Sequence, residues 1–367
     1  MGGLTTTTIV GIGGLVIGLV LGAVSQRTNF CTMGGISDLV LMGDRRRIRA
    51  WVLAIAVAII GTHALHFAGA VDTNKSIYLT TNLGWLGASV GGVLFGFGMT
   101  QTSGCASRTL VRLGGGNLKS LVVALVLGTV AYITMRGLAA PARIRLENAT
   151  NVDLKPYGLA NQNIGEMAGA MLGLDAGMAR AIAAAAVAAA MLIFCFKSAT
   201  FRSSIADVIG GLVVGLTVIG GWVVTGIIAA DEFNPVPLSS ITLVGPTGDS
   251  LQYLMTYTGA TVNFGIALVG GIVAGSFLMA VITGQFRIEG FADRSDLVRN
   301  LVGAALMGAG GVMAMGCSFG QGVTGMSTLA LGSAIAWVSI VAGGYLGVKY
   351  LEEGSFGGAF RAVLTRG

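Results

Sequence analysis

The residues of this 367-residue sequence best suited to chemistry are its four cysteines, Cys31, Cys105, Cys195 and Cys317. They are too few and too widely spaced for a disulfide framework or a zinc cluster. A free thiol can offer a weak S–H donor and a soft, polarizable surface, but many free cysteines simply pack as small apolar side chains. For Cys195, which lies between Phe194 and Phe196, packing is the simpler interpretation.

Cys105 and Cys317 share a local setting, because each follows a glycine, Gly104 or Gly316, and each opens a short polar segment. A helix that starts at such a point presents free backbone N–H groups and the positive end of its dipole, which suits an anion. Cys31 stands in a similar Gly-rich segment. Further donors could come from the side chains of Ser103, Ser107, Ser318 and Gln321. The pattern predicts a binding site for a soft anion.

His63 and His66 are spaced three residues apart, as a pair of metal ligands on one helix face would be. No third histidine is present in the sequence, and no cysteine is near them in the chain. Packing or hydrogen bonding is therefore favoured over metal binding. We expect neither a metal nor another cofactor.

The composition is that of a membrane protein. Hydrophobic residues make up 54% of the chain and charged residues only 10%, against about 25% in an average soluble domain, and the mean hydropathy is +0.81. The 60 glycines suit closely packed membrane helices, in which small residues let backbones approach. We expect an all-α polytopic membrane protein in a lipid bilayer.

A helix that crosses a bilayer needs about 20 predominantly apolar residues. Nine segments meet this need: Thr8–Val24, Ile48–Ala70, Leu83–Gln101, Leu118–Leu138, Ala176–Phe196, Ile205–Ile227, Val262–Thr283, Leu297–Met315 and Thr328–Tyr350. Three further stretches are too polar or Gly-rich to face lipid and too apolar for ordinary loops. We predict that these are short re-entrant segments, namely Arg27–Met42, Ser103–Gly114 and Gly316–Met326.

The basic residues predict an orientation. With nine spans, 16 of the 22 Lys and Arg residues fall on one side and 6 on the other. The richer side should be cytoplasmic, which puts the N-terminus in the periplasm and the C-terminus in the cytoplasm of a bacterium with this protein in its inner membrane. The net charge of +6 is then mostly a topology signal, and nucleic acid is not expected as a partner.

The sequence also contains an internal repeat. The run Gly13–Leu19 recurs as Gly210–Leu216, and the glycine pattern Val90–Cys105 recurs as Val302–Cys317 with one constant offset. We expect a first four-helix repeat over residues 1–140, a linker and fifth helix over 141–200, and a second repeat over 201–367. One linking helix reverses the second repeat, so the repeats should be inverted, as in many secondary transporters.

Three motifs together resemble the YeeE/YedE family of membrane proteins: Asn29-Phe30-Cys31, Gly104-Cys105, and Gly316-Cys317-Ser318-Phe319-Gly320-Gln321-Gly322. The resemblance covers nearly the whole chain and implies an importer of thiosulfate or a related sulfur compound. It implies an hourglass of inverted repeats in which Cys31, Cys105 and Cys317 relay the anion through S–H···S hydrogen bonds. It also implies a small cytoplasmic sulfur-carrier protein as partner, which would be a separate chain here.

The leading hypothesis is therefore a transporter and not an enzyme. One rival is a membrane sulfurtransferase that forms a persulfide on Cys105, with Arg108 as the cation that activates the thiolate. A second rival is a carrier of another small solute, such as sulfite or a selenium oxyanion, in which the cysteines only pack. Mass spectrometry for a persulfide on Cys105 tests the first rival, and competition among sulfate, sulfite, thiosulfate and selenite in liposomes tests the second.

Overall fold

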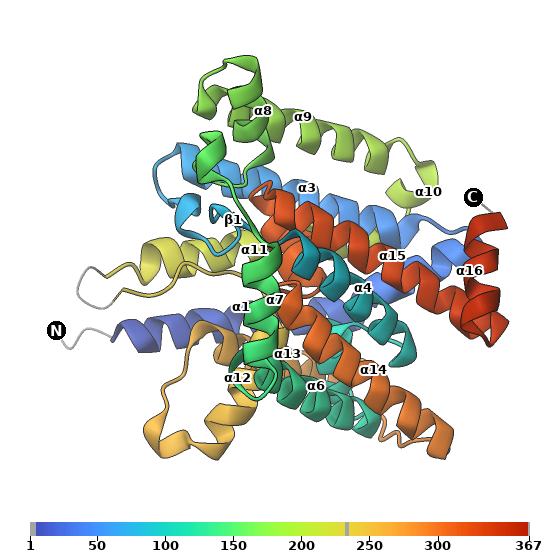
Figure 1. The fold of residues 1–367 in the computed structure, drawn as a ribbon. Coiled ribbons are helices and arrows are strands. Elements are labelled where there is room, and N and C mark those ends of the chain that lie inside the picture. The colour runs from blue at the N-terminus through green and yellow to red at the C-terminus, as the bar shows by residue number, and fades with distance from the viewer. Residues whose placement is uncertain (1–4, 232–234, 366–367) are drawn as a thin grey trace.

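The computed structural model describes residues 5–231 and 235–365, and most of these residues are helical. Regular sheet structure in this part of the chain is one antiparallel pair, β1 (Asn82–Leu83) with β2 (Val152–Asp153). The predicted all-α class is confirmed. Most of the long helices run in roughly the same direction through the molecule (Figure 1).

Seven helices of the described residues are long and apolar enough to cross a membrane. They are α1 (Thr6–Thr28), α3 (Arg46–Phe67), α6 (Leu118–Arg136), α9 (Ala176–Phe196), α11 (Ile205–Val223, continued by a π turn to Ile228), α13 (Phe264–Ile282) and α15 (Leu331–Glu353). Each coincides with one of the nine predicted spans. The chain is thus an all-α polytopic membrane protein.

The other two predicted spans are also helices, α4 (Trp85–Gln101) and α14 (Arg294–Met313). The first is only 17 residues long, and the second starts with a charged turn that includes Asp296. These two helices pack closely against each other. A Cβ atom added at Gly91 would lie 2.6 Å from the Gly310 oxygen, and one added at Gly310 would lie 2.6 Å from the Gly91 oxygen. Glycine at both positions is what lets the two backbones touch.

Four further pairs of long helices pack along each other: α1 with α13, α3 with α11, α4 with α15, and α6 with α14. Helix α9 packs against α3. The contact between α1 and α13 depends on glycines of both helices. A Cβ at Gly18 or Gly22 would collide with the backbone of α13, and one at Gly275 would collide with the backbone of α1. Small residues therefore set the spacing of this pair.

The polar stretch before α9 covers one end of the bundle. It contains α7 (Ala140–Thr150), which lies crosswise to the long helices in Figure 1, and α8 (Ile164–Leu172), which packs on α9. The buried guanidinium of Arg180 on α9 forms a 2.9 Å ion pair with Glu166 of α8. Asn163 donates a 2.8 Å hydrogen bond to the carbonyl of Thr328, just before α15. This stretch is therefore anchored to the bundle.

The three predicted re-entrant segments are short and irregular, and their cysteines are buried, although the first one reaches the surface at Leu41 and Met42. The first holds α2 (Thr32–Ser37) and a π turn, Asp38–Met42, the second holds α5 (Ala106–Gly114), and the third holds a π turn, Gly320–Gly325. The ends of the predicted spans were approximate, and several differ from the helices by two to four residues. Helix α1 continues to Thr28 instead of ending at Val24, because its last turn is polar yet still helical, with the Thr28 hydroxyl bonded to the Val24 carbonyl.

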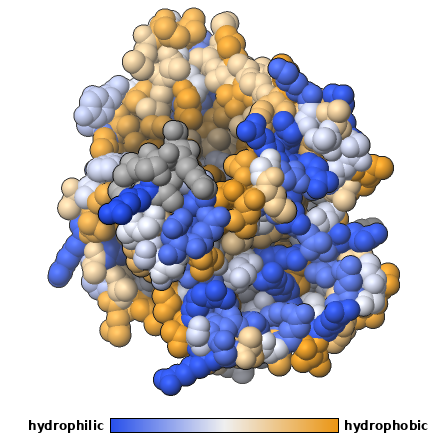
Figure 2. Space-filling view, turned by 90° about the vertical axis from the view of Figure 1, so that its right-hand side faces the viewer, coloured by the Kyte–Doolittle hydropathy of each residue, from blue (hydrophilic) through white to orange (hydrophobic). Residues whose placement is uncertain are grey.

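The described chain begins and ends at opposite ends of the bundle. Helix α1 starts at the left in Figure 1, and α16 (Phe356–Thr365) lies at the right; the termini themselves lie outside the described residues. Figure 2 looks onto the end where α16 lies. Hydrophilic residues gather over the middle and lower parts of this face, and hydrophobic residues cover its upper part and much of its edge. This arrangement is what a bilayer around the rim and water at the end require.

Candidate functional site

The same backbone turn precedes three of the four cysteines. Asn29, Ser103 and Met315 have φ angles of 53°, 54° and 56°, and each stands two residues before a cysteine. The left-handed conformation is uncommon for residues other than glycine, and it ends a helix by turning the chain sharply away from the axis. Helices α1, α4 and α14 all end at this turn. The cysteine that follows then starts the next short helical segment.

Each of these thiols faces free backbone N–H groups of the segment that it opens. Cys31 is the N-cap residue of α2, and Cys105 is the N-cap residue of α5. The N–H group three residues further on, that of Gly34 or Arg108, lies near the respective sulfur. At Cys317 the equivalent N–H of Gly320 donates a 3.5 Å hydrogen bond to Sγ. All three sulfurs thus lie at the positive end of a short helical segment.

The structure brings the turns of Cys31 and Cys105 together. Their two thiols are close enough to interact, and both are buried. Arg108 of α5 donates a 2.7 Å hydrogen bond from Nη2 to Oδ1 of Asn29, in the turn before Cys31. The Cys105 sulfur also lies 3.1 Å from the hydroxyl oxygen of Ser107. Gly104 is buried, and a Cβ there would press against the Arg108 side chain at 3.1 Å.

A cluster of aromatic rings joins the Cys31 turn to the Cys317 segment. The ring of Phe30 lies 4.7 Å from Trp51 and 5.9 Å from Phe319, and Trp51 lies 5.0 Å from Phe319. Trp337 of α15 stacks on Trp51 at 5.4 Å. Phe30 precedes Cys31 directly, and Phe319 comes two residues after Cys317, so all three cysteine segments meet in one region. Cys105 and Cys317 are also close enough to act on each other electrostatically.

Several polar atoms in this region are buried and have no hydrogen-bond partner within the described residues. Among them are three possible donors: the hydroxyl groups of Thr32 and Ser318 and the indole Nε1 of Trp51. The side-chain nitrogen of Gln321 donates a hydrogen bond to the carbonyl of Ala314, and the side-chain oxygen of Gln321 has no partner. A buried donor without a partner costs free energy, and a bound acceptor removes that cost. A Cβ at Gly316 would lie 3.2 Å from the Gln321 side chain, so this glycine permits a tight turn.

Cys195 has a different environment. It is completely buried on α9, and its thiol donates a 3.2 Å hydrogen bond to the backbone carbonyl of Arg49 on α3. Its place between two long helices agrees with the packing role predicted for it. His63 likewise uses Nδ1 for a 3.0 Å hydrogen bond to the carbonyl of Ile59 on its own helix.

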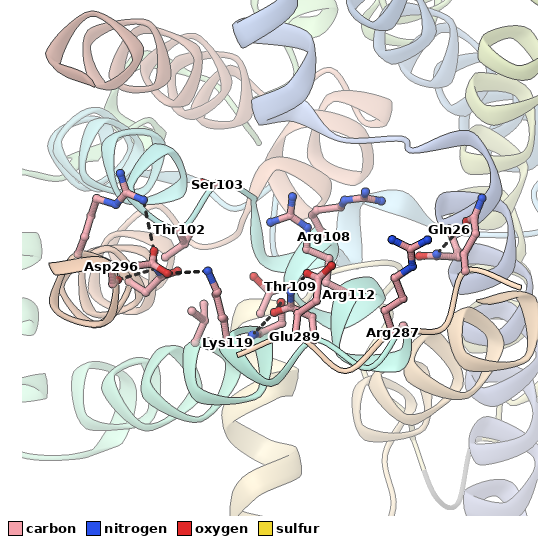
Figure 3. Close-up of a pocket in the computed structure, with 17 residues that line it drawn as sticks. Gln26, Thr102, Ser103, Arg108, Thr109, Arg112, Lys119, Arg287, Glu289 and Asp296 are labelled. Carbon is pink, nitrogen blue, oxygen red and sulfur yellow. Dashed lines mark hydrogen bonds and ion pairs between the residues drawn. The ribbon is translucent and has the colours of Figure 1, made fainter. Parts of the chain in front are cut away.

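Two pockets lie at opposite ends of the bundle. One, here called the arginine pocket, has a volume of about 480 Å³ and lies where α1 and α13 end and α6 and α14 begin (Figure 3). Its lining includes Ser103 and Arg108, which belong to the Cys105 segment. The other, the proline pocket, has a volume of about 390 Å³ and lies where α1 and α13 begin. Its lining includes Thr242, which contacts the Cys317 segment at Gly320.

Some of these features were missed in the sequence. A residue in the left-handed conformation lies two positions before Cys31, Cys105 and Cys317. The sequence does not reveal this repeat, because the three residues are of different types, Asn, Ser and Met. The aromatic cluster was also missed, because Trp51 and Trp337 lie on spans and look like ordinary apolar residues. In the sequence, Arg108 is a candidate cation for activating the Cys105 thiolate, and the other arginines of the pocket serve only as topology signals. Arg108 and Arg112 lie one helical turn apart in the segment that Cys105 opens, and this spacing could have suggested a shared anion site.

Comparison with known proteins shows the family to which the chain belongs. A family model described as sulphur transport matches residues 27–346. A protein of Escherichia coli (strain K12) named thiosulfate transporter TsuA is 28% identical over 331 residues, which cover 85% of this chain and 86% of that protein. A protein of the same name from Spirochaeta thermophila is 26% identical over 343 residues, which cover 90% of this chain and 96% of that protein. The matched region includes all three cysteine segments, and the chain belongs to the sulphur transport family, the YeeE/YedE family that its motifs resemble.

Proposed function

We propose that this protein imports thiosulfate across the bacterial inner membrane, through the region where the three cysteine segments meet. The observation that carries this proposal is the convergence of three helix-capping thiols between two pockets at opposite ends of the bundle. The relatives named thiosulfate transporters, which match over most of their length, support the choice of substrate.

The described contacts suggest an order of sites along the path. From the proline pocket, Thr242 leads to the Cys317 segment, whose sulfur is also faced by the backbone N–H of Leu243. The aromatic cluster lies beside the next step, from Cys317 to the pair Cys31 and Cys105. Arg108 then connects this pair to the arginine pocket. We propose that the anion follows this order during import.

The three cysteine segments are well suited to passing an anion on. Thiol S–H and backbone N–H groups can replace part of the hydration shell of thiosulfate without adding a fixed positive charge. Conduction requires that each site binds strongly enough to admit the ion and weakly enough to release it. Gly104, Gly316, Ser107, Ser318 and Gln321 shape these turns, and we propose that Cys31, Cys105 and Cys317 contact the anion directly.

We infer an inverted relation between residues 1–140 and residues 201–367, joined by 141–200. The helix pairs support it: exchanging the halves converts the pair α1 and α13 into α11 and α3, and the pair α4 and α15 into α14 and α6. The proposed orientation places the proline pocket toward the periplasm and the arginine pocket toward the cytoplasm. A separate small sulfur-carrier protein would collect the imported sulfur there.

Uptake of ³⁵S-thiosulfate into proteoliposomes that contain the purified protein tests this proposal. We expect saturable uptake of the label. An excess of unlabelled thiosulfate should abolish this uptake, and sulfate, sulfite and selenite should reduce it less strongly. Uptake no faster than in empty liposomes contradicts the proposal. Mass spectrometry after thiosulfate exposure addresses the sulfurtransferase alternative, because a transporter should carry no stable persulfide on Cys105.

A further inference from the structure

We propose that the arginine pocket is a second anion site, separate from the thiols, that takes up a divalent oxyanion such as thiosulfate or sulfate at the cytoplasmic end of the path. This inference rests on the proposed function for its direction. It assigns a binding role to three arginines, Arg108, Arg112 and Arg287, that lie beside one another in Figure 3.

The charges of the pocket are unequal. Five cationic side chains line it, and two carboxylates, Glu289 and Asp296, stand against them. Asp296 is fully engaged by two of the cations, because it lies 2.6 Å from Lys119 and 3.3 Å from Arg299. Glu289 accepts a 2.8 Å hydrogen bond from the side chain of Asn117. Asp296 lies apart from the three arginines in Figure 3.

The three remaining guanidinium groups have no ion pair within the described residues. Arg108 uses Nη2 for the neutral oxygen of Asn29, while its Nη1 is buried and has no partner. Arg108 and Arg112 are also close enough to repel each other. A buried donor without a partner costs free energy, and so does the repulsion between two neighbouring cations. A bound anion lowers both of these costs.

The pocket is built before any ligand arrives. The segment after α13 is joined to the turn between α5 and α6 by backbone hydrogen bonds, from Arg287 N to Gly115 O at 3.1 Å and from Leu118 N to Glu289 O at 2.9 Å. Nε2 of Gln26, near the end of α1, donates a 3.3 Å hydrogen bond to Oε1 of Gln285, in the segment after α13. Arg112 and Arg287 are therefore carried on backbone that is fixed in place.

The chemistry selects an oxyanion with two charges. A guanidinium group binds two oxygens of one oxyanion through parallel N–H donors. Three such groups attract a divalent anion more strongly than a monovalent one such as nitrate, because the Coulomb energy grows with the charge of the anion. The volume of about 480 Å³ exceeds what one small oxyanion fills, so water remains beside it and favours its release. The anion that leaves Cys31 and Cys105 would pass to Arg108 first, since this residue contacts both regions.

Anion binding in the arginine pocket can be measured in a variant that lacks the three cysteines of the proposed path. Equilibrium binding of ³⁵S-thiosulfate is measured in detergent on a variant that carries Cys31→Ala, Cys105→Ala and Cys317→Ala, after size-exclusion chromatography has shown that it is monodisperse. We expect saturable binding to persist in this variant. Adding Arg112→Gln and Arg287→Gln should weaken it by about tenfold or more, the size expected for lost hydrogen bonds to a charged group. Adding Arg45→Gln, an exposed arginine outside the pocket, should leave it unchanged.

The competitors and the transport assay separate the possible outcomes. Unlabelled sulfate should displace the label and nitrate should not; equal displacement by nitrate, or no binding once the cysteines are gone, overturns the inference. In oriented vesicles, Arg112→Gln with Arg287→Gln should raise the KM for thiosulfate several-fold from the arginine-pocket side only. A wild-type protein that binds at the arginines but transports no thiosulfate would refute the proposed function and leave the anion site standing.

Discussion

Nη2 of Arg108 lies 2.7 Å from Oδ1 of Asn29, and this hydrogen bond ties the turn before Cys31 to the helix that Cys105 caps. The two residues are far apart in the sequence, and both lie within three positions of a site cysteine. Asn29 also has the left-handed conformation that ends α1. One residue thus stops a long helix and holds the arginine that connects the thiols to the arginine pocket.

Two variants of Asn29 separate its backbone role from its side-chain role. Asn29→Gly keeps the left-handed turn without strain but removes the acceptor for Arg108, so we expect normal protein levels with thiosulfate uptake reduced several-fold. Asn29→Ala should in addition destabilise the fold by about 1 kcal/mol, because a Cβ disfavours positive φ. Uptake and thermal unfolding in detergent are the measurements. Wild-type uptake by the Gly variant would show that the hydrogen bond is dispensable.

Met315 allows the equivalent turn before Cys317 to be tested. With φ of 56°, its conformation is poorly suited to a β-branched residue and well suited to Asn. We expect Met315→Val to lower the apparent Tm and the yield of folded protein, whereas Met315→Asn should match or exceed the wild type. Because Met315 is about half exposed, the loss of its side chain contributes little to either result. Equal stability of the Val and Asn variants would contradict the role of this turn.

Two glycines of α13 offer a matched test of the contact with α1. A Cβ at Gly275 collides with the backbone at Leu19, while one at Gly270 meets open space. Gly275→Ala should force the helices apart and cost about 1–3 kcal/mol, the usual range for overpacking. Gly270→Ala should be neutral or slightly stabilising, since alanine favours the helix. Comparing the unfolding temperatures of the two variants checks the helix spacing directly.

The ion pair between Arg180 and Glu166 should anchor the polar stretch before α9. The Arg180 side chain is 1% exposed, so its removal leaves buried partners without a charge. We expect Arg180→Ala to destabilise the protein by about 3 kcal/mol or more, as breaking a buried pair does. Arg145→Ala, on the exposed surface of α7, is the control and should change little. Limited proteolysis within residues 136–175 should accelerate only in the Arg180 variant.

The sequence was sufficient for the fold class because lipid imposes long apolar helices, and these are visible without any knowledge of packing. A search for apolar runs places the end of α1 too early, because the polar residues up to Thr28 remain helical. The same search does not predict the helix α12 (Val244–Met255). That segment contains Gly245, Pro246 and polar residues, and it is held by packing against α6 and α13.

The candidate site was predictable only in part. Cys105 and Cys317 could be selected because a repeat and a preceding glycine mark both. The meeting of Cys31 with Cys105 could not, since it depends on the Asn29 turn and on the position of Arg108 in space. The aromatic contacts that join Phe30 to Phe319 likewise depend on how α3 and α15 pack, which no local pattern specifies.

Thiosulfate uptake by single cysteine variants tests the central proposal most directly. Cys105→Ala, Cys317→Ala and Cys195→Ala proteins are purified in equal amounts and their initial rates of ³⁵S-thiosulfate uptake into proteoliposomes are compared. We predict that the first two rates fall to the level of empty liposomes, because each removes one thiol from the path, while the Cys195→Ala rate stays close to that of the wild type. Wild-type uptake by Cys105→Ala or by Cys317→Ala would contradict the account.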